Sequence, residues 1–457
     1  MSEESTATEE LSMLEAAPPR SYLTRLIALL GTGTFFDSYD AIVIGSVLPV
    51  LISVFSLSST YAGLLIAITY VGEFLGAIVF GYISEKYGRK TAYIVSIIEY
   101  SVFFVITAAA ASFGMLLALR LLSGLGLGGE VPVAAAMVNE FAGTKKRGKL
   151  VLLYQSVFPW GFLIAPLLAS FIYSYVGVAL GWRVLFLIGI IPLIAGIASI
   201  FALWESPRWL INRGKYESAQ RVINALGTGK AQLNLEGVDL KPKPPRFSEL
   251  FSRQYRIRTA LVWAMWFTAY FINYGMLTWL PTLYVKVGGL PLHLSLMMTA
   301  LVSGLILIVT YIVVAVIDAV GRKPLAITGF TIALAGLAYG SVMTLAYHDA
   351  GWQVLLTTSA LTGVGITGII ALLLYVYTSE LYPTRMRSWG TSVGSSILRV
   401  ATVISTYLVG AIFAASYGYL GMGHVFVMFA VIALAGLVLV TLFGIETKRR
   451  LLEAISP

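Results

Sequence analysis

Residues 81–90 read GYISEKYGRK, and residues 315–323 repeat the pattern as AVIDAVGRK. Both stretches hold an acid, two further residues and then Gly-Arg-Lys, and the glycines Gly88 and Gly321 lie 233 residues apart in a chain of 457. Glycine permits a tight turn between two helices, and the basic side chains after it can meet the acid and the C-terminal ends of neighbouring helices. A basic loop of this kind is common by itself. Its return in register after half the chain predicts an internal duplication.

The sequence around these stretches is that of a polytopic membrane protein. It is 58% hydrophobic and 12% charged, whereas soluble domains carry about 25% charged residues. Apolar runs long enough to cross a bilayer form two sets of six, with a polar segment between them. They begin near Tyr22, Tyr61, Thr91, Met115, Leu150, Arg183, Ile257, Leu292, Pro324, Trp352, Ser388 and Met422. Two related halves with a site between them at the midplane are typical of secondary transporters.

The composition offers no support for several other classes of function. The chain has no cysteine, and its histidines, His293, His348 and His424, are far apart, so we expect no disulfide, metal site or cofactor. No nucleophile–base set or phosphate loop indicates an enzyme. The net charge of +9 could suggest nucleic acid, but the basic residues lie in the loops between apolar runs. We therefore expect a lipid bilayer and no nucleic acid as partner.

The basic residues also predict the topology. Of 31 Lys and Arg residues, Arg120 and Arg399 lie inside predicted spans. Arg183 and Lys286 lie in loops on one side, and all the others lie on the opposite side. Because an excess of positive charge marks cytoplasmic loops, we expect both termini and the central segment in the cytoplasm, and the protein in the plasma membrane.

We expect five segments along the chain. They are a disordered acidic cytosolic tail at 1–20, a six-helix bundle at 21–204, a cytosolic linker with short helices at 205–256, a second six-helix bundle at 257–446, and a cytosolic tail at 447–457. The first segment is acidic and polar, unlike the basic start and apolar core of a signal peptide.

The motifs resemble the major facilitator superfamily over roughly residues 20–450. GYISEKYGRK matches a loop motif of that superfamily, with Glu85 where aspartate is more usual. RLLSGLGLGGEVPVAAAMVNEFAGTKKRG at 120–148, ESPRWL at 205–210, ELYPTRMR at 380–387 and IETKRRLLEAI at 445–455 resemble the branch of sugar porters, organic-ion transporters and nicotinate transporters. The resemblance implies an all-α fold of twelve transmembrane helices in two pseudo-symmetric six-helix bundles. It also implies a monomer that works by alternating access.

Two aspartates stand in the first span, in FFDSYDAIVIG at 35–45. Charged groups are costly in a bilayer, and Asp37 and Asp40 share one helix face because they are three residues apart. YDAIVIG resembles the sugar-porter pattern in which an aspartate, here Asp40, serves proton coupling with an arginine of span four, here Arg120. A buried carboxylate can ionise beside that arginine and takes a proton when the arginine moves away. A fixed pair that only holds helices together is the alternative, and Asp37 is a second coupling candidate.

Arg399 is a permanent charge in the middle of span eleven. Its planar guanidinium suits a carboxylate, and the organic-anion transporters that the sequence resembles carry an arginine at the matching place, linked there to anionic substrates. We predict that it binds the substrate anion. The alternatives are an ion pair with a residue such as Glu130 or Asp37, and a side chain that snorkels to the membrane surface.

Span seven reads WFTAYFINYGMLTWLPTLY at 266–284 and lacks the paired glutamines of sugar porters. Its pattern is similar to that of the organic-acid and nicotinate branches. Gln155 does match a sugar-porter pattern and keeps a polyol substrate open. The predicted substrate-binding residues are Arg399, Gln155, Asn273, Tyr274, Tyr270 and Trp279.

The duplicated loops predict two clusters of residues that form a cytoplasmic gate. By resemblance, their charges latch the outward-facing state. The first cluster comprises Gly81, Glu85, Gly88, Arg89, Glu140 and Arg147. The second comprises Asp318, Gly321, Arg322, Glu380 and Arg385.

The sequence thus predicts a proton-coupled symporter of a small organic anion, such as an aromatic, heterocyclic or sugar acid. A sugar:proton symporter is the alternative. A non-transporting membrane sensor or scaffold is more remote, because the central segment is small for a signalling domain. Glu73 and Glu99, in spans two and three, have no partner that the sequence identifies.

Overall fold

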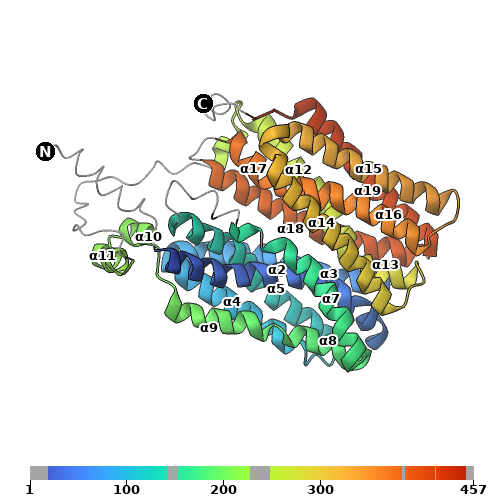
Figure 1. The fold of residues 1–457 in the computed structure, drawn as a ribbon, viewed down its shortest axis with the longest axis horizontal. Helices are drawn as coiled ribbons and strands as arrows, with labels where there is room; N and C mark the ends of the chain where they lie inside the picture. Colours follow the sequence, from blue (N-terminus) through green and yellow to red (C-terminus); the bar gives the residue numbers. More distant parts are fainter. Residues whose placement is uncertain are drawn as a thin grey trace.

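The computed structural model describes residues 19–141, 150, 153–226, 247–382, 386–416 and 418–448, and the regular elements in those ranges are all helices. Twelve helical spans in this part of the chain are long and apolar enough to cross a membrane. This confirms the twelve predicted spans. Figure 1 shows the helices of the first half beside those of the second half, all running roughly along one direction.

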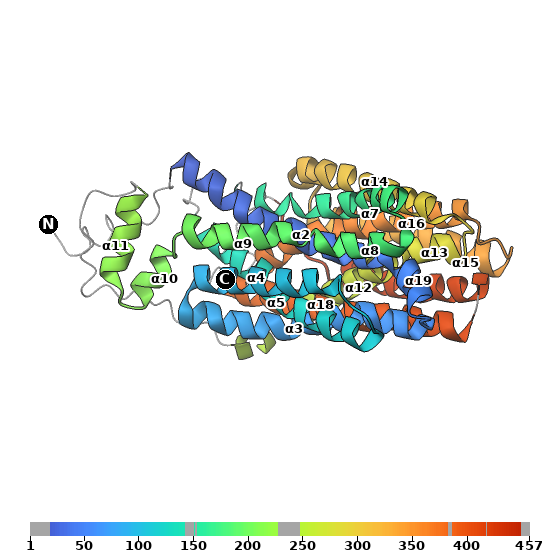
Figure 2. The ribbon, with the colours of Figure 1, turned by 90° about the horizontal axis from the view of Figure 1, so that it is seen from below.

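The first half supplies six of these spans. They are α2 (Arg20–Val54), α3 (Ser59–Tyr87), α4 (Arg89–Thr107), α5 (Phe113–Phe141), α7 (Phe158–Val176), and α8 (Val178–Leu187) followed by α9 (Ile190–Ala202). Three short helices then precede the second half, namely α10 (Pro207–Asn212), α11 (Tyr216–Ala225) and the 3₁₀ helix η1 (Phe247–Phe251). Figure 2 shows α10 and α11 beyond one end of the long helices.

The second half repeats the arrangement. Its elements are α12 (Arg256–Leu277), α13 (Leu280–Lys286), α14 (Leu292–Val320), α15 (Arg322–Leu345), α16 (Trp352–Gly363), the π-helix η2 (Val364–Ala371), α17 (Leu372–Leu381), α18 (Arg387–Ala415) and α19 (Gly418–Phe443). α16, η2 and α17 together form one span.

The duplicated loop forms the same turn in both halves. Gly88 joins α3 to α4 with φ of 110°, and Gly321 joins α14 to α15 with φ of 107°. Residues with a Cβ rarely adopt this backbone region. The backbone conformation at both positions therefore favours glycine over any other residue.

In each half, a carboxylate that follows the last helix caps the N-terminus of the helix after this turn. Glu205 accepts hydrogen bonds from the first two backbone N–H groups of α4, at 2.9 and 3.1 Å. Glu446 does the same for α15, at 3.1 and 3.0 Å. Burial raises the pKa of Glu205. Burial also opposes ionisation of Glu446, but four backbone N–H groups outweigh it and lower its pKa. Both carboxylates stabilise a helix N-terminus whose N–H groups lack partners in the helix.

The glycine-rich span four packs closely against span two. A Cβ on Gly124 would lie 2.1 Å from the carbonyl oxygen of Thr69, and one on Gly128 would lie 2.0 Å from that of Glu73. These glycines serve helix contact, as in other membrane bundles. The close approach brings Arg120 of α5 next to α3.

Two pairs of antiparallel helices join the halves. α3 crosses α18 so closely that a Cβ on Gly63 would meet the carbonyl oxygen of Thr406 at 2.8 Å, and one on Gly410 would meet that of Ser59 at 2.4 Å. α7 lies along α14, where the Trp160 indole N–H donates to the Tyr311 hydroxyl at 3.2 Å.

Burial differs between the two ends of the long helices. The end that holds Arg89 and Arg322 is here named the charged end. The second part of α2, residues 41–51, is buried throughout, as are residues 268–284 of α12 and α13. Nearer the charged end, α2 and α12 both have exposed positions. The halves are thus packed together most completely at the end opposite the charged end.

Candidate functional site

Asp40 and Arg120 form a bidentate ion pair inside the first half. Nη1 of Arg120 donates to Oδ1 of Asp40 at 2.6 Å, and Nη2 donates to Oδ2 at 2.7 Å. Nε donates to the Thr69 hydroxyl at 3.1 Å. All five donors of a guanidinium are costly to bury unpaired, and here each nitrogen has an acceptor.

The surroundings of this pair are apolar. Arg120 and Asp40 have exposures of 0% and 1%. The guanidinium carbon lies 5.9 Å from the ring centres of both Phe104 and Phe186. The ion pair that the sequence suggested is therefore present. Its geometry is compatible with a fixed structural pair and with a coupling pair, and a role in proton coupling stays a prediction.

Arg399 lies opposite Glu73, across the contact between α18 and α3. Its Nε is 3.4 Å from Oε2 of Glu73. Nη1 donates to the carbonyl oxygen and the hydroxyl of Ser395, both at 3.0 Å. The acid beside Arg399 thus comes from span two, whereas the sequence suggested a partner such as Glu130 or Asp37. Both side chains are buried, so Arg399 does not snorkel to a surface.

Asp37 connects the two pairs electrostatically. The charges of Arg399 and Asp40 both act on the Asp37 carboxyl group. Asp37 is partly exposed although it lies within a span. Glu73 is in turn within the range of Asp37, Asp40 and Arg120 as well as Arg399. Three carboxyl groups and two guanidinium groups therefore form one cluster, here named the charge cluster, which spans both halves.

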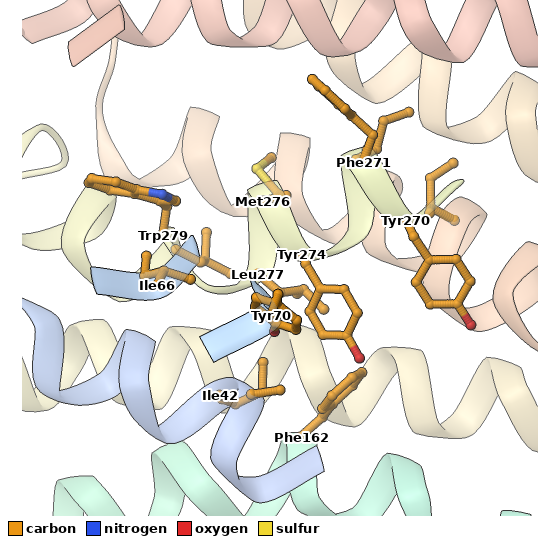
Figure 3. Close-up of a cluster of buried hydrophobic side chains, with 14 of the residues drawn as sticks. Ile42, Ile66, Tyr70, Phe162, Tyr270, Phe271, Tyr274, Met276, Leu277 and Trp279 are labelled. Carbon is orange, nitrogen blue, oxygen red and sulfur yellow. The ribbon is translucent and has the colours of Figure 1, made fainter. Parts of the chain in front are cut away.

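A row of aromatic rings runs past the charge cluster. Tyr274 of α12 lies 5.2 Å from Tyr70 of α3 and 6.5 Å from Phe162 of α7, measured between ring centres. Figure 3 shows the Tyr274 ring beside these two rings, with Tyr270 further along the same helix. Tyr270 follows Tyr274 at 5.9 Å. The rings come from both halves, as a site between two bundles requires.

The row continues within the second half. Trp266 stacks on Tyr270 at 5.3 Å with an angle of 10° between the rings, and it meets Tyr375 at 4.9 Å. Tyr375 lies within the electrostatic range of Arg399. It is 36% exposed although it lies within span ten, six residues before the end of α17. Trp266 and Tyr375 thus extend the aromatic row within the second half.

The other predicted substrate residues lie in different surroundings. Oδ1 of Asn273 accepts from the Thr367 hydroxyl at 2.6 Å, on the π-helix η2. The indole N–H of Trp279 donates to the carbonyl oxygen of Thr406 at 3.2 Å, at the close crossing of α3 and α18. Gln155 is partly buried three residues before α7. The described contacts place Tyr70 and Tyr274 beside the charge cluster, because both tyrosines interact with Glu73 and Asp37.

Glu130 occupies a separate position in the first half. It is 0% exposed, and neither carboxylate oxygen has a hydrogen-bond partner in the described part of the chain. It lies against Gly33 of α2, where an added Cβ would be 2.3 Å from Oε1. The structure does not bring it to Arg399.

The two predicted gate clusters form matching ion pairs. Arg89 contacts Glu85 at 2.9 Å and Glu140 at 3.2 Å. Arg322 contacts Asp318 at 2.9 Å and Glu380 at 2.8 Å in the second half. Each cluster joins the end of one helix to the start of the next, at the charged end. The predicted members Arg147 and Arg385 lie outside the described residues.

Sequence reasoning missed three residues of this region. Glu73 was noted without a partner, and Tyr70 and Phe162 were not identified. One signal was available, because Tyr70 lies three residues before Glu73 and so shares its helix face. The ring of Phe162 gave no such signal, since an aromatic residue in an apolar span usually serves packing.

The whole chain matches known transporters. The family model described as sugar (and other) transporter matches residues 24–457. The niacin transporter of Acinetobacter baylyi is 30% identical, over 98% of this chain and 99% of that protein. A putative niacin/nicotinamide transporter of Bacillus subtilis is 27% identical, over 94% of this chain and 98% of that protein.

Solved structures with the same fold include sugar transporters. A crystal structure of a D-xylose–proton symporter superposes with a TM-score of 0.76 at 19% identity, covering 94% of this chain and 99% of that chain. The xylose transporter of E. coli in a partially occluded inward-open conformation gives a TM-score of 0.76 at 18% identity, covering 94% and 100%. At these identities the likeness concerns the fold alone.

Proposed function

The chain belongs to the sugar (and other) transporter family of the major facilitator superfamily, and from this premise we propose that it is a proton-coupled symporter of a small aromatic or heterocyclic carboxylate. The single observation that carries the proposal is the position of Arg399. A buried arginine faces Glu73 at the contact between the two halves, and a row of aromatic rings from both halves lies in the same interface.

The chemistry of these side chains suits such a substrate. A guanidinium can bind a carboxylate through two parallel hydrogen bonds, and aromatic rings favour offset-stacked or edge-to-face contact with another ring. The hydroxyl of Tyr70 is buried without a hydrogen-bond partner among the described residues. It is available to donate to a bound acid.

The balance of charges supports coupling to protons. With all groups ionised, the charge cluster has three negative and two positive charges. An added substrate anion would raise the excess negative charge in a region where charges are poorly solvated, which is costly. Uptake of one proton with each anion keeps the net charge unchanged. Asp40, Asp37 and Glu73 are the carboxylates that could accept it.

The arrangement of the halves supports alternating access. They are packed most completely at the end opposite the charged end, and α3–α18 and α7–α14, with α2 against the junction of α12 and α13, form contacts between them. The proposed cycle opens the two ends in turn around the charge cluster. Arg89 and Arg322, with their acids, would latch the charged end in one of the two states.

The relatives support the same class of substrate. The niacin transporter of Acinetobacter baylyi takes its name from a heterocyclic carboxylate and matches this chain along nearly its whole length. A sugar:proton symporter is the second candidate, because Gln155 matches a sugar-porter pattern. It predicts that neutral sugars are transported and that Arg399 is dispensable.

Uptake into proteoliposomes with an imposed inward proton gradient tests this proposal. The substrates would be nicotinate, benzoate, a sugar acid, nicotinamide and xylose, tested on the wild type and on Arg399→Ala. We expect accumulation of an acid only with the gradient, and a loss of at least tenfold in Arg399→Ala, because a hydrogen bond to a charged group contributes about 1.5–3 kcal/mol. The matched control is Arg183→Ala, at an arginine that stacks on Trp182 away from the site. Accumulation of xylose by both Arg399→Ala and the wild type would favour the sugar symporter instead.

A further inference from the structure

We propose that Glu73 is an internal counter-ion that occupies Arg399 in the empty transporter and that the substrate carboxylate displaces. This inference rests on the proposed function and extends it. Glu73 would compete with every anionic substrate for the same guanidinium. It would also accept the proton that accompanies the anion.

The first argument comes from a comparison of the two arginine pairs. Arg120 holds Asp40 with two short hydrogen bonds, at 2.6 and 2.7 Å. Arg399 and Glu73 approach through one contact of 3.4 Å, longer than the roughly 2.7–2.9 Å of a strong charge-assisted hydrogen bond. The Nε–H of Arg399 has no hydrogen-bond acceptor in the described ranges. Arg120 is therefore fully engaged, whereas Arg399 keeps donor capacity for a second carboxylate.

The second argument comes from the position of the loose pair. Glu73 belongs to the first half and Arg399 to the second, so the pair bridges the surfaces that must separate in alternating access. α3 and α18 cross closely at Gly63 and Gly410. The pair lies ten and eleven residues further along the two helices, or about 15 Å at 1.5 Å per residue. It thus lies deep in the interface and away from the tight crossing.

The third argument comes from the neighbours of Glu73. Tyr70 precedes it on the same helix face, and the ring of Tyr70 contacts that of Tyr274 at 5.2 Å. A substrate ring held by these tyrosines would place its carboxylate next to the Glu73–Arg399 contact. The titratable and charged groups that face Glu73 are Asp37, Asp40, Arg120, Arg399, Tyr70 and Tyr274.

Displacement of Glu73 from Arg399 leads directly to proton uptake by Glu73. Arg120 is already held by Asp40, so a released Glu73 has no other free cation in the charge cluster. A buried carboxylate without a counter-charge is strongly unfavourable and is relieved by protonation. The net charge of the cluster is unchanged by this exchange. The substrate carboxylate replaces the Glu73 carboxylate at Arg399, and one proton taken up from solution neutralises Glu73.

The mechanism separates acids from their neutral analogues. Nicotinamide has the ring of nicotinate but no negative charge, so it cannot compensate Arg399 when Glu73 leaves. The competition also lowers the apparent affinity for acids, because only the fraction of molecules with Arg399 available binds. Removal of the Glu73 charge should therefore tighten the binding of acids and leave nicotinamide unaffected.

Binding to the purified full-length protein in nanodiscs tests the inference. Titration calorimetry with nicotinate, benzoate and nicotinamide would compare the wild type, Glu73→Gln and the control Glu99→Gln, whose carboxylate lies beside Gly126 in the first half. Proton uptake on binding would be followed with a pH indicator in weak buffer. In Glu73→Gln we expect the Kd for the preferred acid to fall about tenfold and proton uptake to be lost. Glu99→Gln should behave as the wild type does.

Each outcome has a definite meaning. Weaker or unchanged acid binding in Glu73→Gln, or proton uptake like that of the wild type, would overturn the role of Glu73 and leave the proposed function standing. If the wild type binds no acid, the proposed function fails and the inference fails with it. If Glu73→Gln does not fold, Glu73→Asp replaces it. Its shorter side chain loosens the pair, so the Kd should fall by a smaller factor, and a Kd equal to that of the wild type would count against the inference.

Discussion

At the scale of single residues, the two intramembrane arginines behave differently. Arg120 has an acceptor for each of its nitrogens within the first half. Arg399 bridges the halves with a long contact and unused donor capacity. The loose pairing of Arg399 suits a group that exchanges partners, whereas the tight pairing of Arg120 is compatible with a structural pair and with a coupling pair.

Tyr70 provides a test at this scale. Its hydroxyl is buried and has no hydrogen-bond partner in the described residues, so the change Tyr70→Phe should not lower the melting temperature. If the hydroxyl donates to the substrate, the KM for the transported acid should rise about three- to tenfold, as expected for the loss of one hydrogen bond of about 1 kcal/mol. Uptake kinetics and a thermal melt check both parts. A lower melting temperature with an unchanged KM would show that the hydroxyl has only a structural role.

The sequence predicted one arginine pair and missed the other, for a physical reason. An intramembrane charge must have a partner, but the partner can lie anywhere along the chain. The motif around Asp40 resembled a known pattern, and this led to Arg120. Glu73 and Arg399 lie 326 residues apart and meet only because α3 and α18 cross between the halves, which no local pattern encodes.

At the scale of elements, the duplicated turn is the best-defined feature. Gly88 and Gly321 share nearly the same backbone angles, and each is covered by a carboxylate from the end of its own half. The sequence predicted the turn because glycine followed by basic residues is a local signal. It did not predict the covering carboxylates Glu205 and Glu446, which lie more than 100 residues away from the turns they cover.

Gly88→Ala tests this turn, with Gly81→Ala as the matched control. A Cβ on Gly88 would lie 2.1 Å from Oε2 of Glu205, and its φ of 110° disfavours any side chain. We expect Gly88→Ala to lower the stability by about 1–3 kcal/mol. Gly81 is helical and has nothing within 4 Å of an added Cβ, so Gly81→Ala should be neutral or slightly stabilising. Thermal unfolding of both variants in detergent gives the comparison, and equal effects would contradict the role assigned to the turn.

At the scale of the whole molecule, the hydrophobic pattern was enough to predict the architecture. Twelve apolar runs in two sets of six became twelve helical spans. The pattern could not predict which helices of one half contact those of the other, because lipid-facing and interface-facing surfaces are both apolar. The helix contacts α3–α18 and α7–α14 are therefore seen only in the structure. The same holds for the site between the halves.

Transport against a gradient is a property of the whole molecule and gives the most direct test of proton coupling. The measurement compares the wild type with Asp40→Asn in proteoliposomes, using proton-driven accumulation of the preferred acid and its counterflow exchange without a gradient. If Asp40 with Arg120 couples the proton, Asp40→Asn should lose accumulation about 100-fold or more, while exchange continues, because a neutral side chain cannot cycle between two protonation states. Glu217→Gln, at an exposed carboxylate of α11 outside the charge cluster and the gate clusters, controls for the loss of a charge. Full accumulation by Asp40→Asn would contradict the coupling role and leave the Asp40–Arg120 pair as a fixed structural contact.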